Sequence, residues 1–192
     1  MDRREAITKV GLLLGGTVIG SSMFIEYGCN PTPEKLKDNE LFNQNQITLM
    51  NEMGETIMPK TSTPGAKEAN VGAFMAVMVR DCYDKRDQGV FLEGLKRLDE
   101  KCRKENGKAF MDCTPEQRTA FFIDMDKKQK YYMANKKPEQ PSHYFRMLKE
   151  LTILGFFTSE VGATKALRYV AIPGKYDGNM PYKKGDHAWA TT

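Results

Sequence analysis

The sequence is poor in the side chains from which most catalytic and metal sites are built. Its 192 residues include two histidines, four cysteines and one tryptophan. None of the cysteines forms a C-x-x-C pair, which excludes a zinc ribbon, a dithiol redox motif and a c-type haem attachment site. His143 lies near a predicted helix start and is expected to be a surface or capping side chain, whereas His187 lies in the C-terminal tail and is expected to pack there. Two such histidines offer little for a metal site or a nucleophile–histidine–acid set.

The motifs of common cofactor-binding and hydrolytic enzymes are also missing. The chain has no G-x-G-x-x-G after a strand pattern, no P-loop and no G-x-S-x-G. Its formal net charge is only +4, and no basic block alternates with aromatic residues as in a nucleic-acid groove. We therefore expect no catalytic residue, cofactor-binding residue, metal ligand or nucleic-acid partner in this chain.

Residues 1–29 have the features of an export signal. Arg3 and Arg4 precede an apolar, glycine-rich segment that runs without charge from Val10 to Ile25. This segment is short for a membrane span, and its charged and apolar regions follow the order of a signal peptide. The arginine pair resembles a twin-arginine signal, which exports proteins that are already folded. Export by the general secretory route and a retained N-terminal anchor are the alternatives.

Cys29 ends the apolar segment and adds lipoprotein processing as a further alternative. Glu26 and Tyr27 depart from the small or branched residues that usually precede an acylated cysteine, so a lipid anchor stays open. Residues 30–44 are expected to form a linker, and residues 45–192 the folded domain. The expected location is the periplasm, with membrane attachment through the leader or a lipid.

Helical periodicity recurs along the rest of the chain, and no region carries several alternating strand patterns. The sequence predicts an all-α bundle of about five helices with an irregular C-terminal tail. The fifth helix, with an apolar face that includes Leu154, is expected to be the central buried one. The expected helices lie at 45–58, at 71–82, between Gln88 and Gly107, from Thr114–Pro115 onward, and from a cap at Ser142 onward.

Three cysteines fall within these helices or beside them. Cys82 and Cys102 lie at core spacing and are expected to be buried, whereas Cys113 precedes a helix start and is expected to be the most accessible. In an exported protein, a disulfide within the chain or to a partner stays open. Asp124 and Asp126 are followed by lysines, which favours a solvated charged face over a catalytic carboxylate pair.

The stretch from Gly155 to Ala163 combines aromatic side chains, small residues and one carboxylate. Phe156 and Phe157 are adjacent and therefore point about 100° apart on a helix. We expect one ring to be buried and the other to be substantially exposed. Glu160 is the one acid in this apolar context, and a lone carboxylate without a base is weak support for catalysis.

Two blocks of the sequence resemble the gluconate 2-dehydrogenase subunit 3 family. The segment from Glu55 to Ala66 is similar to the family's E-x-I-x-P-x-T-x-T-P-G-A block. The stretch from Gly155 to Ala163 is similar to its G-[YF]-F-T-S-E-x-G block. Leu167, Tyr169, Pro173, Gly174, Tyr176 and the Ala188–Trp189 ending are similar to the residues that follow that block in the family, and the arginine-pair leader is typical of it.

The resemblance implies a non-catalytic small subunit of a membrane-associated or periplasmic dehydrogenase. The implied partner is a large FAD-dependent subunit of the glucose–methanol–choline type, which oxidises sugars, sugar acids or glycosides, often with a cytochrome c subunit as electron acceptor. FAD is expected in that partner, and the small subunit is expected to carry the export signal for it. Many relatives have a cysteine near position 179, where this chain has Asn179, so a covalent link through that position is not carried over.

Partner contact is expected, beside structural packing, at the second block and the residues that follow it. One alternative is a stand-alone carbohydrate-active enzyme that uses Glu160 and Tyr169. Another is a lipid-anchored periplasmic scaffold without a dehydrogenase partner. The candidate contact residues are Phe156, Phe157, Thr158, Ser159, Glu160, Tyr169, Pro173, Gly174 and Tyr176.

Overall fold

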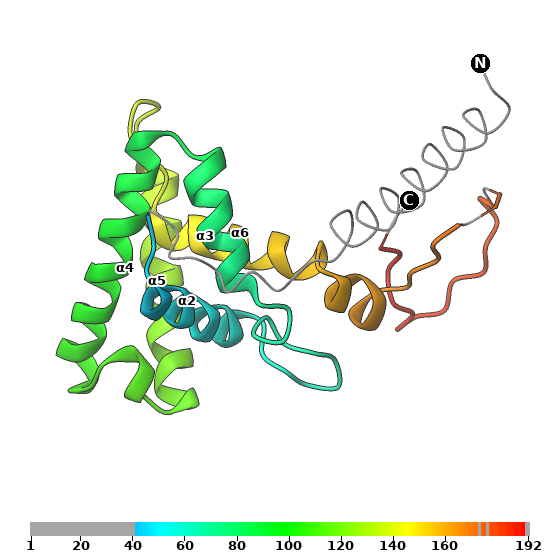
Figure 1. The fold of residues 1–192 in the computed structure, drawn as a ribbon, viewed down its shortest axis with the longest axis horizontal. Coiled ribbons are helices and arrows are strands. Elements are labelled where there is room, and N and C mark those ends of the chain that lie inside the picture. Colours follow the sequence, from blue (N-terminus) through cyan, green and yellow to red (C-terminus); the bar gives the residue numbers. More distant parts are fainter. Residues whose placement is uncertain (1–40, 173, 176, 191–192) are drawn as a thin grey trace, which may run out of the picture. The chain divides into compact units, whose positions relative to one another are not determined.

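The computed structural model describes residues 41–172, 174–175 and 177–190, and the predicted all-α class is confirmed there (Figure 1). This part of the chain contains five α-helices and two short helical turns, which are joined by loops and followed by an irregular tail. Arg3, Arg4, Cys29, Pro173 and Tyr176 lie outside the described residues. The elements are α2 (Gln44–Ile57), α3 (Val71–Cys82), α4 (Lys85–Asn106), η1 (Phe110–Asp112), α5 (Pro115–Asn135), α6 (Tyr144–Phe157) and η2 (Gly162–Ala166).

Side-chain caps explain where several of these helices begin. Asn43 caps α2, because its Oδ1 accepts from the Gln46 amide at 2.9 Å while Gln46 Oε1 accepts from the Asn43 amide at 3.0 Å. Thr114 and Gln117 form the same reciprocal box at the start of α5, as predicted. Each box satisfies two backbone amides that a helix start otherwise leaves without partners.

α6 lies at the centre of the bundle and contacts α2, α3, α4 and α5. Phe145, Leu148, Leu151 and Phe156 are buried along it, which confirms the predicted central helix. Its only buried hydroxyl is also satisfied, because Thr152 Oγ1 donates to Leu148 O at 2.7 Å. The apolar side chains of five helices thus form one core around α6.

Two glycines allow helices to approach closely at this centre. A Cβ atom on Gly72 would lie 2.5 Å from the backbone oxygen of Ile47, so α3 rests directly on the backbone of α2. A Cβ atom on Gly155 would lie 2.6 Å from the Phe74 ring, so glycine at this position lets α6 pack closely against α3. Real Cβ atoms do not tolerate such distances, and larger residues here would force the helices apart.

The predicted starts of two helices were wrong. α4 begins at Lys85 rather than at Gln88, because Asp84 Oδ1 accepts from the Asp87 amide at 2.8 Å and caps the helix earlier. Gln88 is instead buried inside the helix. The cap of α6 is His143 rather than Ser142, because His143 Nδ1 accepts from the Phe145 amide at 3.2 Å.

The predicted exposures of two cysteines were also wrong. Cys82 is exposed, because it is the last residue of α3 and lies beyond the part of the helix that covers the core. Cys113 is buried, because η1 folds Phe110 inward and brings the following cysteine against α4. Cys102 is buried, as expected.

Candidate partner-docking surface

The turn after α6 is built by the residues of the second sequence block. Thr158 Oγ1 donates to Leu154 O at 2.7 Å, and Ser159 Oγ donates to Phe156 O at 2.6 Å and accepts from the Gly162 amide at 3.0 Å. A Cβ atom on Gly162 would lie 1.9 Å from Phe156 O. Thr158, Ser159 and Gly162 therefore satisfy and shape the end of α6, where carbonyls would otherwise lack partners.

The two phenylalanines of this block separate as the helical geometry predicts. Phe156 is 1% exposed and lies in the core, whereas Phe157 is 38% exposed, so the predicted split is confirmed. Phe157 shares its side of α6 with Ile153 and Leu154, which are also exposed. Leu154 was expected on the buried face, and that prediction was wrong. Leu154 and Ile153 lie three and four residues before Phe157, so all three side chains share the side of α6 that faces away from the core. We call Ile153, Leu154 and Phe157 the α6 strip.

Glu160 lies on the exposed surface just after α6. A carboxylic acid that acts as a general acid near neutral pH usually lies in a buried, apolar environment. Tyr169, which the enzyme hypothesis pairs with Glu160, is also exposed. This environment gives the catalytic alternative no support from geometry. Among the described residues there is also no group of three or more His, Cys, Asp or Glu side chains that could hold a metal ion.

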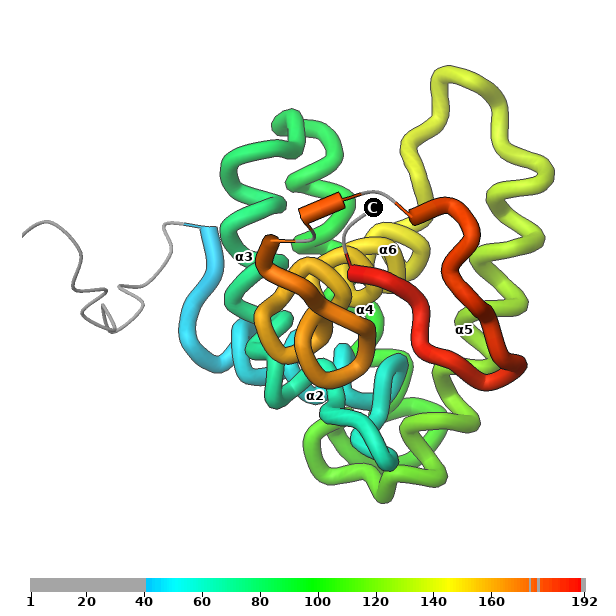
Figure 2. Tube along the Cα trace, turned by 90° about the vertical axis from the view of Figure 1, so that its right-hand side faces the viewer, coloured from blue at the N-terminus to red at the C-terminus, as the bar shows by residue number. Residues whose placement is uncertain are grey.

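The C-terminal tail leaves η2 as an irregular loop (Figure 2). Arg168 closes the base of this loop. The Arg168 amide donates to Ala188 O at 2.8 Å, and Arg168 O accepts from the Ala190 amide at 2.8 Å. The guanidinium Nε donates to His187 O at 2.7 Å. Arg168 thereby joins the end of η2 to residues 187–190, some twenty positions further along the chain.

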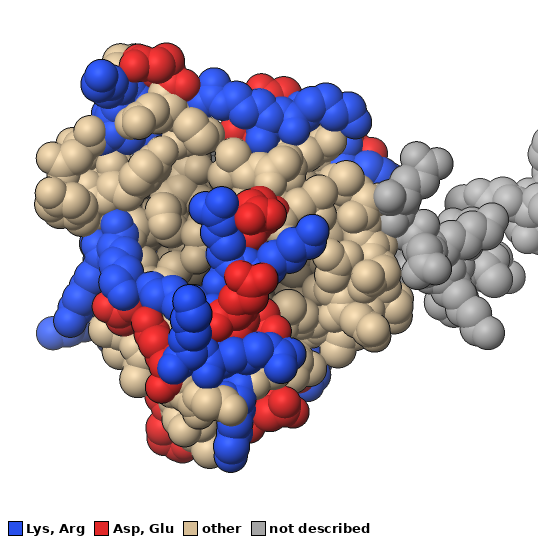
Figure 3. Space-filling view, turned by 90° about the vertical axis from the view of Figure 1, so that its left-hand side faces the viewer, with Lys and Arg blue, Asp and Glu red and all other residues tan. Residues whose placement is uncertain are grey.

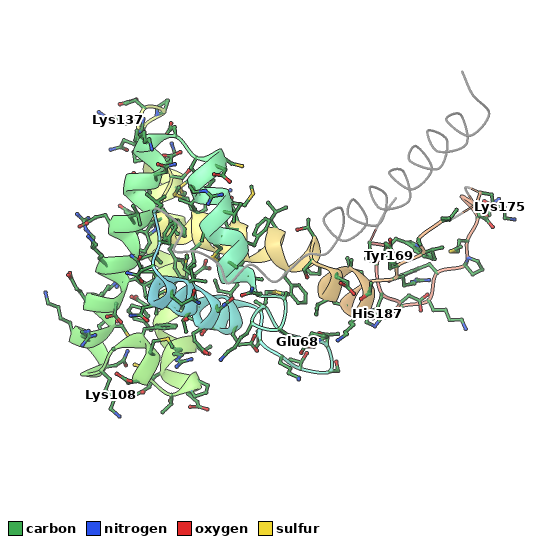
Figure 4. The ribbon with its side chains drawn as sticks, viewed as in Figure 1. Glu68, Lys108, Lys137, Tyr169, Lys175 and His187 are labelled. Carbon is green, nitrogen blue, oxygen red and sulfur yellow. The ribbon has the colours of Figure 1, made fainter. Side chains whose placement is uncertain are left out.

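The same guanidinium makes two further contacts in the tail. Its Nη2 lies 3.3 Å from Asp186 Oδ2, and its carbon Cζ lies 5.0 Å from the centre of the Trp189 ring. His187 adds a ring contact to the end of η2, with Nδ1 2.6 Å from Ala166 O. We call these contacts of Arg168 and His187 the clasp, and residues 169–188 the tail loop. Figure 4 places Tyr169 and His187 near η2 and Lys175 at the far end of the loop.

The tail loop exposes apolar side chains instead of burying them. Tyr182 is 76% exposed and Ile172 is 84% exposed. Gly174, one of the predicted contact residues, is exposed with φ of +71°, a backbone conformation that favours glycine. The large hydrophobic residues exposed from the base of the loop to its end are Tyr169, Val170, Ile172, Met180, Tyr182 and Trp189.

The face that includes α4 is different in character. Figure 3 shows Lys and Arg side chains interleaved with Asp and Glu on this face. On the adjoining α5, Asp124 pairs with Lys128, and Asp126 pairs with Lys130 at 2.8 Å and with Lys149. Burial opposes ionisation of Asp126, but hydrogen bonds from Lys130 and Lys149 outweigh it and lower its pKa to about 2. The two aspartates are thus members of ion pairs, as predicted.

Several features of this candidate surface have no local signal in the sequence. The clasp joins Arg168 to residues that lie about twenty positions further along, and no local pattern marks such a contact. Ile153 adjoins residues of the buried face and was not expected at a surface.

No helix in the described part of the chain has the length and apolar character that a membrane crossing requires.

Comparison with known families agrees with the sequence blocks. The family model described as gluconate 2-dehydrogenase subunit 3 matches residues 44–174, well over half of the chain, and this range contains both blocks. No curated protein and no solved structure is similar enough to the chain to count as a match. On the extent of this match, the chain belongs to the gluconate 2-dehydrogenase subunit 3 family.

Proposed function

We propose that this chain is the non-catalytic small subunit of an exported FAD-dependent dehydrogenase complex, and that it binds the large flavoprotein subunit through the α6 strip and the tail loop. The observation that carries the proposal is the set of apolar side chains exposed before η2, on the α6 strip, and after η2, on the tail loop. The family to which the chain belongs is described as a dehydrogenase subunit. The substrate of the complex would be a sugar, a sugar acid or a glycoside.

The composition of this surface supports a protein partner. Interface hot spots are enriched in aromatic side chains, and tyrosine and tryptophan combine apolar area with a polar group. The tail loop and its base carry Tyr169, Tyr182 and Trp189, and the α6 strip carries Phe157. Long irregular loops in compact domains are usually either functional or linker segments, and closure of this loop at its base by Arg168 favours the functional reading.

The clasp supports the same proposal, because it reduces the cost of ordering the loop on binding. A loop whose two ends are already joined loses less conformational entropy when a partner fixes it. Arg168 and His187 supply that closure through contacts to the backbone and to Trp189. Their proposed role is to position the loop, and the exposed apolar side chains would make the contacts.

The leader supports a role in export. Arg3 and Arg4 precede the apolar segment, and a twin-arginine signal carries folded proteins. In this proposal the flavoprotein loads FAD in the cytoplasm, binds the small subunit there and crosses to the periplasm as its passenger. A cytochrome c subunit would then accept the electrons, and Cys29 is the candidate for lipid attachment.

Co-purification from cells that express both subunits tests the interface. Tyr182→Ser and Tyr131→Ser form a matched pair, because both tyrosines are 76% exposed and Tyr131 lies on α5. Adding Phe157→Ser should deepen the loss of bound flavoprotein caused by Tyr182→Ser. Of the matched pair, Tyr182→Ser alone should lose most of the bound flavoprotein, and Tyr131→Ser should retain it. Equal retention by the two variants would overturn the proposed surface.

A separate experiment tests export. Changing both Arg3 and Arg4 to Lys should leave the complex intact in the cytoplasm and remove flavin-dependent dehydrogenase activity from the periplasm. Normal periplasmic activity in this double variant would contradict the passenger role without affecting the interface. Turnover by the purified chain alone, abolished by Glu160→Gln, would instead favour the enzyme alternative.

A further inference from the structure

Two buried cysteines face each other between α4 and the segment that follows it. Cys102 lies in the last turns of α4, and Cys113 directly follows η1. Their sulfur atoms are 3.5 Å apart, and neither side chain is more than 5% exposed. We propose that Cys102 and Cys113 are a site of covalent modification, where a disulfide-bearing oxidant joins them in an intrachain disulfide that links α4 to the η1 segment.

The local geometry allows the bond to form with a small movement. A disulfide requires its sulfur atoms to be about 2.0 Å apart, so these sulfurs must approach by roughly 1.5 Å. The contacts that this movement would disturb are weak: Asn106 Nδ2 donates to Cys102 Sγ at 3.5 Å, and Cys113 Sγ donates to Lys108 O at 3.9 Å. Gly107, with φ of +70°, lies in the exposed connection between the two cysteines and leaves it room to adjust.

The η1 segment is held in place independently of the thiols. The Phe110 amide donates to Asp99 Oδ1 at 2.9 Å, while Arg118 donates to Phe110 O at 3.0 Å and to Met111 O at 2.7 Å. The Phe110 ring is fully buried and lies 5.1 Å, centre to centre, from that of Phe122. The fold therefore brings the two sulfurs together whether or not they are bonded.

The reaction exchanges one disulfide for another. A thiolate of the pair attacks a sulfur of the oxidant, which releases one thiol and leaves a mixed disulfide. The second thiolate then attacks the sulfur of the first cysteine and releases the oxidant's other thiol. The chain loses two electrons and two protons, and the oxidant's disulfide is reduced to two thiols.

Burial controls the rate of this reaction. Burial raises the pKa of the Cys102 thiol to about 11, so little thiolate forms in the closed structure. The oxidant also cannot reach either sulfur directly, because both are buried. In the folded chain the reaction therefore has to wait until the connection between α4 and η1 opens, whereas the exposed Cys82 needs no such opening to meet the oxidant.

Peptide mapping of the full chain, purified in reduced form and incubated with oxidised glutathione, tests the bond. Trypsin cleaves after Lys101, Arg103, Lys108 and Arg118, so the bond would join the peptide 102–103 to the peptide 109–118. We expect this linked pair to appear and to disappear on reduction, with Cys82 as the unpaired control. Free Cys102 and Cys113 after denaturation, in protein incubated long enough for local opening, would overturn the proposal.

Thermal unfolding supplies a second readout. Closing a loop of this length is expected to raise the Tm of the oxidised chain by about 5–10 °C over the reduced chain. Cys113→Ala should remove the difference between oxidising and reducing conditions, even if it lowers the Tm in both. An unchanged difference in that variant would contradict a Cys102–Cys113 bond. Linked peptides that form with glutathione but are missing from protein isolated from cells would support the site and count against export to an oxidising compartment.

Discussion

The helical body and the C-terminal tail use large apolar side chains in opposite ways. In the body, Phe42, Phe91 and Phe145 are buried around α6. In the tail, Ile172 and Tyr182 are exposed on a loop that is closed at its base by the clasp. The body buries most of its large apolar side chains and leaves a smaller set exposed, which includes the α6 strip, whereas the tail loop exposes nearly all of those that the structure describes. This contrast is the basis for the proposal that the tail loop contacts another molecule.

The largest predicted effect contrasts a body ring with a surface ring. Phe145→Ala removes a fully buried ring that lies 5.0 Å from Phe122, and should lower the free energy of unfolding by about 3–5 kcal/mol. Phe157→Ala removes a ring from the α6 strip and should cost about 1 kcal/mol or less. Urea denaturation of the two variants measures both values. Similar losses would erase the proposed distinction between body and surface.

The next effect concerns a polar group within the body. The Gln88 amide donates to Val79 O, Arg80 O and Tyr83 O at 2.9–3.1 Å, and so satisfies the end of α3. Gln88→Ala should cost about 1–3 kcal/mol, because it removes a buried donor from these carbonyls. Lys96→Ala on the same helix is exposed and should change stability by less than about 0.5 kcal/mol. A stability for Gln88→Ala as high as that of the control would show that Gln88 does not hold α3.

A clasp variant should separate binding from stability. Arg168→Ala should leave the unfolding free energy of the body within about 0.5 kcal/mol, because its contacts lie in the tail. It should weaken binding of the flavoprotein about tenfold, because the loop must then be ordered on binding. Arg97→Ala, an exposed arginine paired with Glu93 on α4, is the control. The clasp would have no role in binding if titration gave both variants the same affinity.

The smallest effect is a pH dependence that arises in the body. The pKa of Asp126 is about 2 in the folded chain and 3.8 without its partners, so its ion pairs stabilise the fold above about pH 4. This contribution should be lost as the pH falls from about 4 to 2, by about 1 kcal/mol after allowance for solvent screening. Asp126→Asn should make the free energy of unfolding depend less on pH in that range. An unchanged slope in this variant would assign the pH dependence to other carboxylates.

Local signals in the sequence predicted most of the body. The reciprocal cap at Thr114 and Gln117 marks the start of α5, and the spacing of the apolar residues marks the buried faces of α4 and α5. Gln88–Gly89 was misread as a helix start, because the role of Gln88 is to bond to α3 rather than to begin α4. The burial of Cys113 depends on η1, which is too short to carry a periodic pattern.

The candidate surface was less predictable than the body. Helical geometry required Phe156 and Phe157 to differ in exposure, but the choice between them depends on how α6 packs against the other helices. The clasp depends on contacts between Arg168 and residues 186–190, which no local rule connects. The family resemblance indicated a subunit and a contact region from Phe156 to Tyr176, and the structure adds the exposure of Ile153, Leu154 and Tyr182 to the proposed surface.

Hydrogen exchange of the chain, alone and with the flavoprotein subunit bound, tests the proposed interface most directly. We expect slower amide exchange on binding in residues 153–157 and 168–190, with little change along α4. Protection that falls on the charged face of α4 while the tail loop exchanges as fast as in the free chain would contradict it.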